Sequence, residues 1–209
     1  MTNLEMALCA QRKFNQHMEF EAERVKREMK SPCRARCAWC CHQVVSATLF
    51  EAALILQSAE GYEASRWWPV VQKQADDFLA RRPHTTEVAW YKAQTPCALL
   101  LDGTCSMYSV RPTACRMHIA NEGSDCSPKS KGHLGNDPAP YNFKLWDLAE
   151  AQSDSIEVPF LYGPLPVVLT WAHIMLSKGA VTLKQHLSGT PFQDPISAIA
   201  YWAYVELSA

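Results

Sequence analysis

The sequence has no excess of charge of either sign. Its 209 residues contain 20 lysines and arginines against 21 aspartates and glutamates, which gives a formal net charge of −1. A strong basic excess is the usual electrostatic mark of proteins that bind nucleic acid or an anionic membrane. The balance therefore predicts neither kind of binding, and we expect the partner to be a protein or a peptide.

The sequence also lacks a long hydrophobic run, and we expect no targeting segment. The longest apolar tract, Pro164–Leu176, is interrupted by Thr170 and His173, and it is much shorter than the roughly 20 residues that cross a bilayer. Residues 1–6 have neither the basic start nor the apolar stretch of a signal peptide. We therefore expect a soluble, cytoplasmic protein. In that reducing compartment, clustered cysteines are more often metal ligands or redox centres than disulfides.

The sequence does contain 9 cysteines, and all but Cys9 fall into two groups. The first group has the spacing C-x3-C-x2-C-C, and the second has the spacing P-C-x7-C-x9-C followed by one more cysteine. Neither group has enough chain, or close enough spacing, to surround a metal by itself, so we expect mixed sites. The predicted metal ligands are Cys33, Cys37, Cys40, Cys41, Cys97, Cys105, Cys115 and Cys126.

The chemistry of the predicted centre follows from thiolate ligands. Thiolates bind zinc at about 2.3 Å and also hold iron–sulfur clusters, so ligand type does not separate the two metals. Eight thiols suit two four-thiolate sites, or one cluster with spare thiols. Because adjacent residues project in different directions, we expect Cys41 to face a second centre or the core, or to be a reactive thiol. His42 or His118 could replace one sulfur.

Positive side chains accompany the predicted ligands. Arg111 and Arg116 lie within four residues of Cys115, and we predict that they bind the cofactor by donating hydrogen bonds to sulfur from outside the ligand shell. Arg34 and Arg36 lie between the first two cysteines of the first group. They suit the same role, or they are solvated surface charges.

The cysteine motifs resemble a known family. C-x3-C-x2-C-C, P-C-x-L and G-x-C-x-x-Y-x-x-R-P-x-x-C-R resemble the YkgJ-type cysteine-cluster proteins, described as zinc- or iron-chelating domains. The matching positions lie in Cys33–Cys41, Pro96–Leu99 and Gly103–Arg116, with Ala38 where such proteins often have glycine. The resemblance implies metal or iron–sulfur binding, usually in bacteria. The family is similar in part to flagellin lysine N-methylases, although this chain has no recognisable glycine-rich S-adenosylmethionine loop.

The pattern of apolar residues predicts a mainly α-helical fold with a small irregular β-hairpin region around the metal centre. We expect an N-terminal amphipathic helix in residues 1–32, a cysteine-cluster domain in 33–126, and a helical region in 141–209 packed on it. The N-terminal helix either packs on the body or binds a partner. The turn Asp102-Gly103 predicts the hairpin. The expected helices are 3–30, 48–60, 65–81, 86–93, 141–152, 165–178, 181–187 and 195–208.

Details of two helices follow from local chemistry. Thr48 and Glu51 have the spacing of a capping box, which predicts a helix start at that point. Pro69 is compatible with the next helix only in its first turn, so that helix is predicted to begin between Ser65 and Trp68. Gly61 is then expected to end the helix before it.

These observations predict a metal-binding protein that holds an iron–sulfur cluster, of the 4Fe-4S type, through its clustered cysteines. The cluster would be redox-active, or it would serve an enzyme that modifies a protein or peptide. The alternative is a structural zinc module that mediates protein–protein interaction. No residue is assigned a catalytic role.

Overall fold

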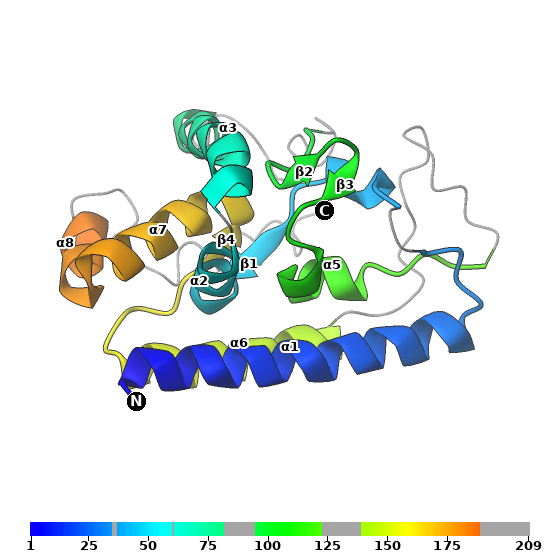
Figure 1. Cartoon of the computed structure of the whole chain (residues 1–209). Helices are drawn as coiled ribbons and strands as arrows, with labels where there is room; N and C mark the ends of the chain where they lie inside the picture. The colour runs from blue at the N-terminus through cyan, green and yellow to red at the C-terminus, as the bar shows by residue number, and fades with distance from the viewer. Residues whose placement is uncertain (35–36, 60, 82–94, 123–138, 189–209) are drawn as a thin grey trace.

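The computed structural model of the chain describes residues 1–34, 37–59, 61–81, 95–122 and 139–188 (Figure 1). Within these ranges the fold is mainly helical with two small antiparallel sheets, which confirms the predicted fold class. The predicted helices 86–93 and 195–208 lie outside the described residues, as do Arg36 and Cys126. The predicted division into three regions is not tested by this architecture and stays a prediction.

The long N-terminal helix α1 (Asn3–Glu28) begins with a capping box. The Thr2 hydroxyl accepts a hydrogen bond from the Glu5 N–H at 3.2 Å, and the Glu5 carboxylate accepts from the Thr2 N–H at 2.7 Å. Helix α6 (Ala139–Ser155) runs beside α1 (Figure 1). Leu8 and Met18 are among the α1 side chains that are buried, so one face of the predicted amphipathic helix packs on the body.

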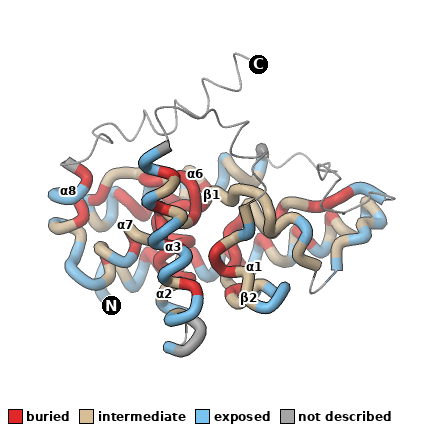
Figure 2. Tube along the Cα trace, turned by 90° about the horizontal axis from the view of Figure 1, so that it is seen from above, coloured by how far each residue is buried: buried red, intermediate tan, exposed pale blue. Residues whose placement is uncertain are grey.

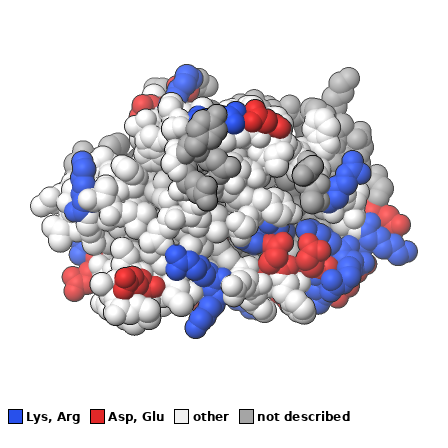
Figure 3. Space-filling view, viewed as in Figure 1, with Lys and Arg blue, Asp and Glu red and all other residues white. Residues whose placement is uncertain are grey.

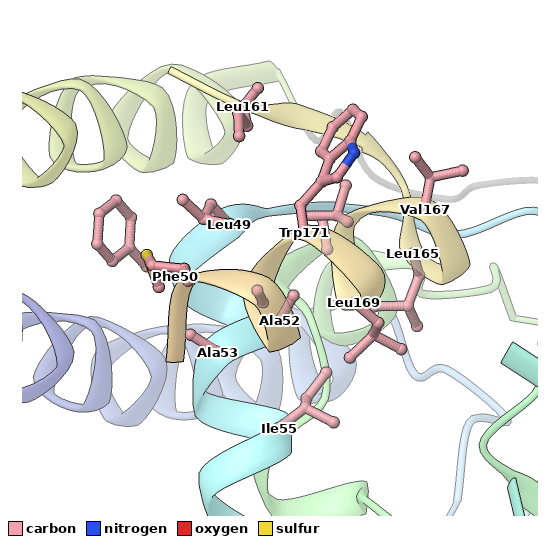
Figure 4. Close-up of a cluster of buried hydrophobic side chains, with 14 of the residues drawn as sticks. Leu49, Phe50, Ala52, Ala53, Ile55, Leu161, Leu165, Val167, Leu169 and Trp171 are labelled. Atoms are coloured by element: carbon pink, nitrogen blue, oxygen red, sulfur yellow. The ribbon is translucent and has the colours of Figure 1, made fainter. Parts of the chain in front are cut away.

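The core is organised around helix α2 (Leu49–Ser58), which is buried along its first seven residues. The predicted capping box is present: Thr48 and Glu51 exchange hydrogen bonds at 3.0 and 3.2 Å. Helix α7 (Leu165–Lys178) packs against α2, and Figure 4 shows Leu165, Leu169 and Trp171 of α7 among the α2 side chains. Figure 2 shows that buried residues concentrate where these elements meet.

Helix α3 (Gly61–Arg81) differs from the prediction at its start. Gly61 begins this helix instead of ending the previous one, and Pro69 lies inside the helix, so the prediction for this boundary is wrong. Pro69 itself is exposed, whereas Trp67 and Val71 on either side of it are buried in the core. Tertiary packing of these two side chains outweighs the local preference of proline for a first turn.

The two sheets are short and antiparallel. Strand β1 (Ser46–Thr48) pairs with β4 (Tyr162–Pro164), with Ala47 opposite Gly163. Strands β2 (Leu100–Leu101) and β3 (Thr104–Cys105) form the predicted hairpin. Its turn residues, Asp102 and Gly103, have φ angles of 52° and 74°, and two successive positive φ angles are the requirement of a type I′ turn.

The C-terminal helices follow the predicted order. Helix α7 has the predicted bounds, and α8 (Ala180–Ser188) is one residue longer at each end than predicted. Gly179 separates them as the C-cap of α7 with a φ of 86°, a conformation that suits glycine. In the described part of the chain, no helix combines the length and apolar character that crossing a bilayer requires.

Candidate metal centre

Five of the predicted ligands lie on four chain segments and are near enough for their charges to interact. Cys40 and Cys41 lie in the short 3-10 helix η1 (Trp39–His42), Cys97 precedes β2, and Cys105 ends β3. Cys115 lies in helix α5 (Thr113–Met117). A backbone hydrogen bond of 2.7 Å from the Cys97 N–H to the Cys41 carbonyl joins the two cysteine groups. The two cysteine groups, which we predicted to share metal sites, are therefore joined directly through their backbones.

The five thiols, which we call the thiol cluster, influence one another's ionisation. Burial raises the pKa of the Cys97 thiol to about 11, and it also raises the pKa values of Cys105 and Cys115. Charge on Cys40 would raise all three further. Bringing several thiolates into this environment is therefore costly unless a cation compensates their charge.

The adjacent cysteines Cys40 and Cys41 interact with each other and with other thiols of the cluster. A hydrogen bond between the two side chains lowers the pKa of Cys40 to about 7 and raises that of Cys41. Cys41 also interacts with Cys115 and Cys97. Both residues lie in the short helix η1, and whether Cys41 is a ligand or a reactive thiol stays a prediction.

The remaining cysteines are placed differently. The Cys33 sulfur accepts a hydrogen bond from the Ala120 N–H at 3.4 Å, and the Cys37 N–H donates to the Arg34 carbonyl at 3.1 Å. Cys9 lies apart on α1, and all the described cysteines are free of disulfides.

The two predicted cofactor-binding arginines are buried beside the thiol cluster, but their hydrogen bonds go elsewhere. Arg111 donates to the Tyr108 carbonyl and to Glu19, and its guanidinium lies 3.8 Å from the centre of the Tyr108 ring. Arg116 donates to two backbone carbonyls and to Glu19. The positive charge of Arg111 nevertheless lowers the pKa values of Cys40, Cys105 and Cys115, although burial outweighs this effect in Cys105 and Cys115. Its influence on sulfur is thus electrostatic.

Comparison with known proteins identifies the segment that carries the thiol cluster. Residues 32–131 match the model of the CxxCxxCC family, described as "Putative zinc- or iron-chelating domain". This segment is similar to the cysteine-cluster family. Searches of curated proteins and of solved structures gave no match. The family supports metal binding through the cysteines of this domain, with zinc or iron as the metal.

The donor set of the cysteine-cluster domain fits such a metal. Thiolates are soft ligands that select zinc and iron–sulfur clusters over magnesium or calcium. Because the pKa values of Cys97, Cys105 and Cys115 are raised, these thiols need a compensating cation to ionise together, which a bound metal supplies. Among the described residues, no three Cys, His, Asp or Glu side chains stand close enough together to form a ready-made site for a single ion.

A cavity of about 110 Å³ adjoins the thiol cluster at Cys97. Phe78, Leu165 and Leu169 are among its apolar lining residues, and Gln74 is among its polar ones. The Gln74 side-chain amide donates to the Pro96 carbonyl at 2.8 Å, which ties α3 to the residue before Cys97. The cysteine-cluster domain thus has a small open space next to one of its thiols.

Sequence reasoning missed two carboxylates that hold the domain together. Glu51 is fully buried on α2, and its Oε1 accepts a hydrogen bond of 2.7 Å from the Thr113 N–H at the start of α5. Its Oε2 accepts from the Thr48 N–H. The capping-box pattern identified the local bond to Thr48, but no sequence signal indicates the bond to Thr113. Glu19 on α1 is the second carboxylate.

Replacing Glu51 by glutamine is expected to lower the free energy of unfolding by about 1–3 kcal/mol, because one of the two buried N–H donors loses its acceptor. Burial raises the pKa of the Glu51 carboxyl above its usual 4.5, so folding favours the protonated form. The contribution of Glu51 to stability therefore declines as the pH rises from 4.5 towards the raised pKa. Urea unfolding across this range measures how much less stable Glu51→Gln is than the wild type. This difference in the free energy of unfolding is expected to shrink as the pH rises, and a difference that grows would contradict this account.

Proposed function

We propose that the cysteine-cluster domain holds an iron–sulfur cluster that exchanges electrons. The observation that carries this proposal is that Cys40, Cys41, Cys97, Cys105 and Cys115, on four separate segments, lie near enough for their charges to interact. A single zinc ion takes four such ligands, so the thiol cluster offers more sulfur than one zinc needs. Cysteine thiolates are the usual ligands of iron–sulfur clusters, including the 4Fe-4S type that we favour.

The electrostatics of the centre suit a cluster that gains and loses an electron. Cysteine-ligated clusters become more negative on reduction, and a nearby fixed positive charge stabilises the reduced state. Arg111 supplies such a charge beside Cys40, Cys105 and Cys115.

A protein or peptide partner is the proposed counterpart of the cluster. Two large aromatic side chains next to the centre are exposed: Trp39, which precedes Cys40, is 48% exposed, and Tyr108, beneath Arg111, is 39% exposed. Aromatic side chains are enriched at protein interfaces. The charges of α1 are of both signs and pair with one another along the helix (Figure 3), which supports a protein rather than a nucleic acid as the partner.

Zinc is the second candidate, in a structural role. The elements that carry the thiol cluster are only two to five residues long, and elements of this size gain much of their stability from cross-links. Structural zinc provides such a link, and in small peptides its binding contributes about 10–16 kcal/mol to folding. A zinc module of this kind would present the surrounding helices to a partner.

A redox titration tests the proposed function. The protein purified without oxygen is expected to absorb visible light, to lose part of that absorbance when dithionite is added, and to regain it with a mild oxidant. A metal-loaded protein whose spectrum does not respond to either reagent would contradict electron exchange and favour the structural role.

A further inference from the structure

Two buried arginines of the cysteine-cluster domain take their counter-charge from outside the domain. Arg111 Nη2 donates to Glu19 Oε1 at 3.0 Å, and Arg116 Nη1 donates to Glu19 Oε2. The side chains of Arg111 and Arg116 are 8% and 2% exposed. Glu19 lies on α1, before the segment 32–131 that matches the family. The match therefore assigns Glu19 no role.

The two arginines organise the chain between the hairpin and Cys115. Arg111 Nη1 donates to the Tyr108 carbonyl at 2.8 Å, and Arg116 Nη2 donates to the Ser109 carbonyl at 2.7 Å. Arg116 Nε closes the network at the Arg111 carbonyl, at 3.0 Å. The path of residues 108–116, which follow Cys105 and include Cys115, thus depends on where the two guanidinium groups are held.

Glu19 holds the guanidinium groups of Arg111 and Arg116 in place. Two buried positive charges that lie side by side repel each other, and leaving them without a counter-charge is costly. Glu51 also attracts Arg116, but its two oxygens already accept from the Thr48 and Thr113 backbone. Figure 1 shows α5 lying over α1, so the carboxylate reaches the arginines from the helix beneath them.

We propose that Glu19 is a positioning residue for the metal centre: it holds Arg111 and Arg116 so that α5 presents Cys115 to the thiol cluster. This inference rests on the proposed function only in that the thiol cluster binds a metal, whichever metal it is. It follows that the family segment is completed by α1, and that a carboxylate distant in sequence sets the geometry of one ligand.

The test compares Glu19→Gln with wild type in cobalt(II) binding. Cobalt added to the metal-free protein under anaerobic conditions reports affinity by titration and ligand geometry by the intensity and position of its thiolate absorption bands. Loss of groups that orient metal ligands typically costs 10–100-fold in affinity, and we expect at least a tenfold loss together with altered bands. Glu19→Asp, which keeps the charge, is expected to recover part of the affinity.

The matched control is Glu21→Gln, on the same helix. Glu21 pairs with Arg24, away from the thiol cluster, so this variant is expected to bind cobalt as the wild type does. All samples are compared at a temperature where circular dichroism shows native helix content. If Glu19→Gln melts earlier but keeps wild-type affinity and bands, Glu19 serves stability alone and the inference is wrong. If the wild type binds neither cobalt nor any other metal, the proposed function fails as well.

Discussion

Replacing Cys115 by serine is expected to remove most of the bound metal and to lower the melting temperature of the purified protein. Cys115 is a half-buried thiol of the cluster, and it is the one carried by α5. Dividing the roughly 10–16 kcal/mol of a structural four-ligand site by its ligands gives about 3 kcal/mol for one of them, or about a hundredfold in affinity. Metal content per chain and thermal melting, with and without a chelator, measure the effect.

The control for this substitution is Cys9→Ser. Cys9 lies on α1, outside the segment 32–131 that matches the family. The serine variant is expected to keep the wild-type metal content. Wild-type metal content in Cys115→Ser would show that Cys115 is not a ligand and that the thiol cluster does not act as a unit.

Replacing Arg116 by leucine is expected to lower the free energy of unfolding by about 3–5 kcal/mol. The side chain is 2% exposed and donates to the Arg111 and Ser109 carbonyls and to Glu19. Leucine leaves the two carbonyls without these donors, which accounts for most of the loss. Glu19 is 36% exposed, so water replaces part of its lost partner and the ion pair itself contributes less.

Urea unfolding of the metal-free protein isolates the effect of Arg116 from that of the metal. Arg24→Leu is the control, because Arg24 makes two ion pairs on the surface of α1 and such pairs contribute little to stability. The urea concentration at the unfolding midpoint is expected to fall in Arg116→Leu and to stay near the wild-type value in Arg24→Leu. Wild-type-like midpoints in both variants would mean that the buried network does not hold residues 108–116.

Local sequence signals predicted the elements that local chemistry decides. The capping box at Thr48 and Glu51 marked the start of α2 because both partners lie within one turn. The Asp102-Gly103 turn marked the hairpin because few residues accept two positive φ angles. The motifs of the thiol groups also indicated a metal-binding domain, which the family match supports.

Contacts between distant segments were not predictable in the same way. Glu19 meets Arg111 and Arg116 across more than 90 positions, and nothing in the spacing of α1 distinguishes Glu19 from the other glutamates of that helix. The helix around Pro69 forms because Trp67 and Val71 are buried by other elements. In each case the stabilising contact is made by a residue distant in sequence, which local sequence patterns do not identify.

The most direct test of the thiol centre is the analysis of metal and acid-labile sulfide in protein purified without oxygen. The account predicts iron and sulfide in similar amounts, with both lost together in Cys115→Ser and both retained in Cys9→Ser. Zinc without sulfide would contradict the iron–sulfur proposal and leave the structural role. A wild-type protein that contains neither metal, and that binds neither when it is supplied, would contradict the central claim that the gathered thiols form a metal centre.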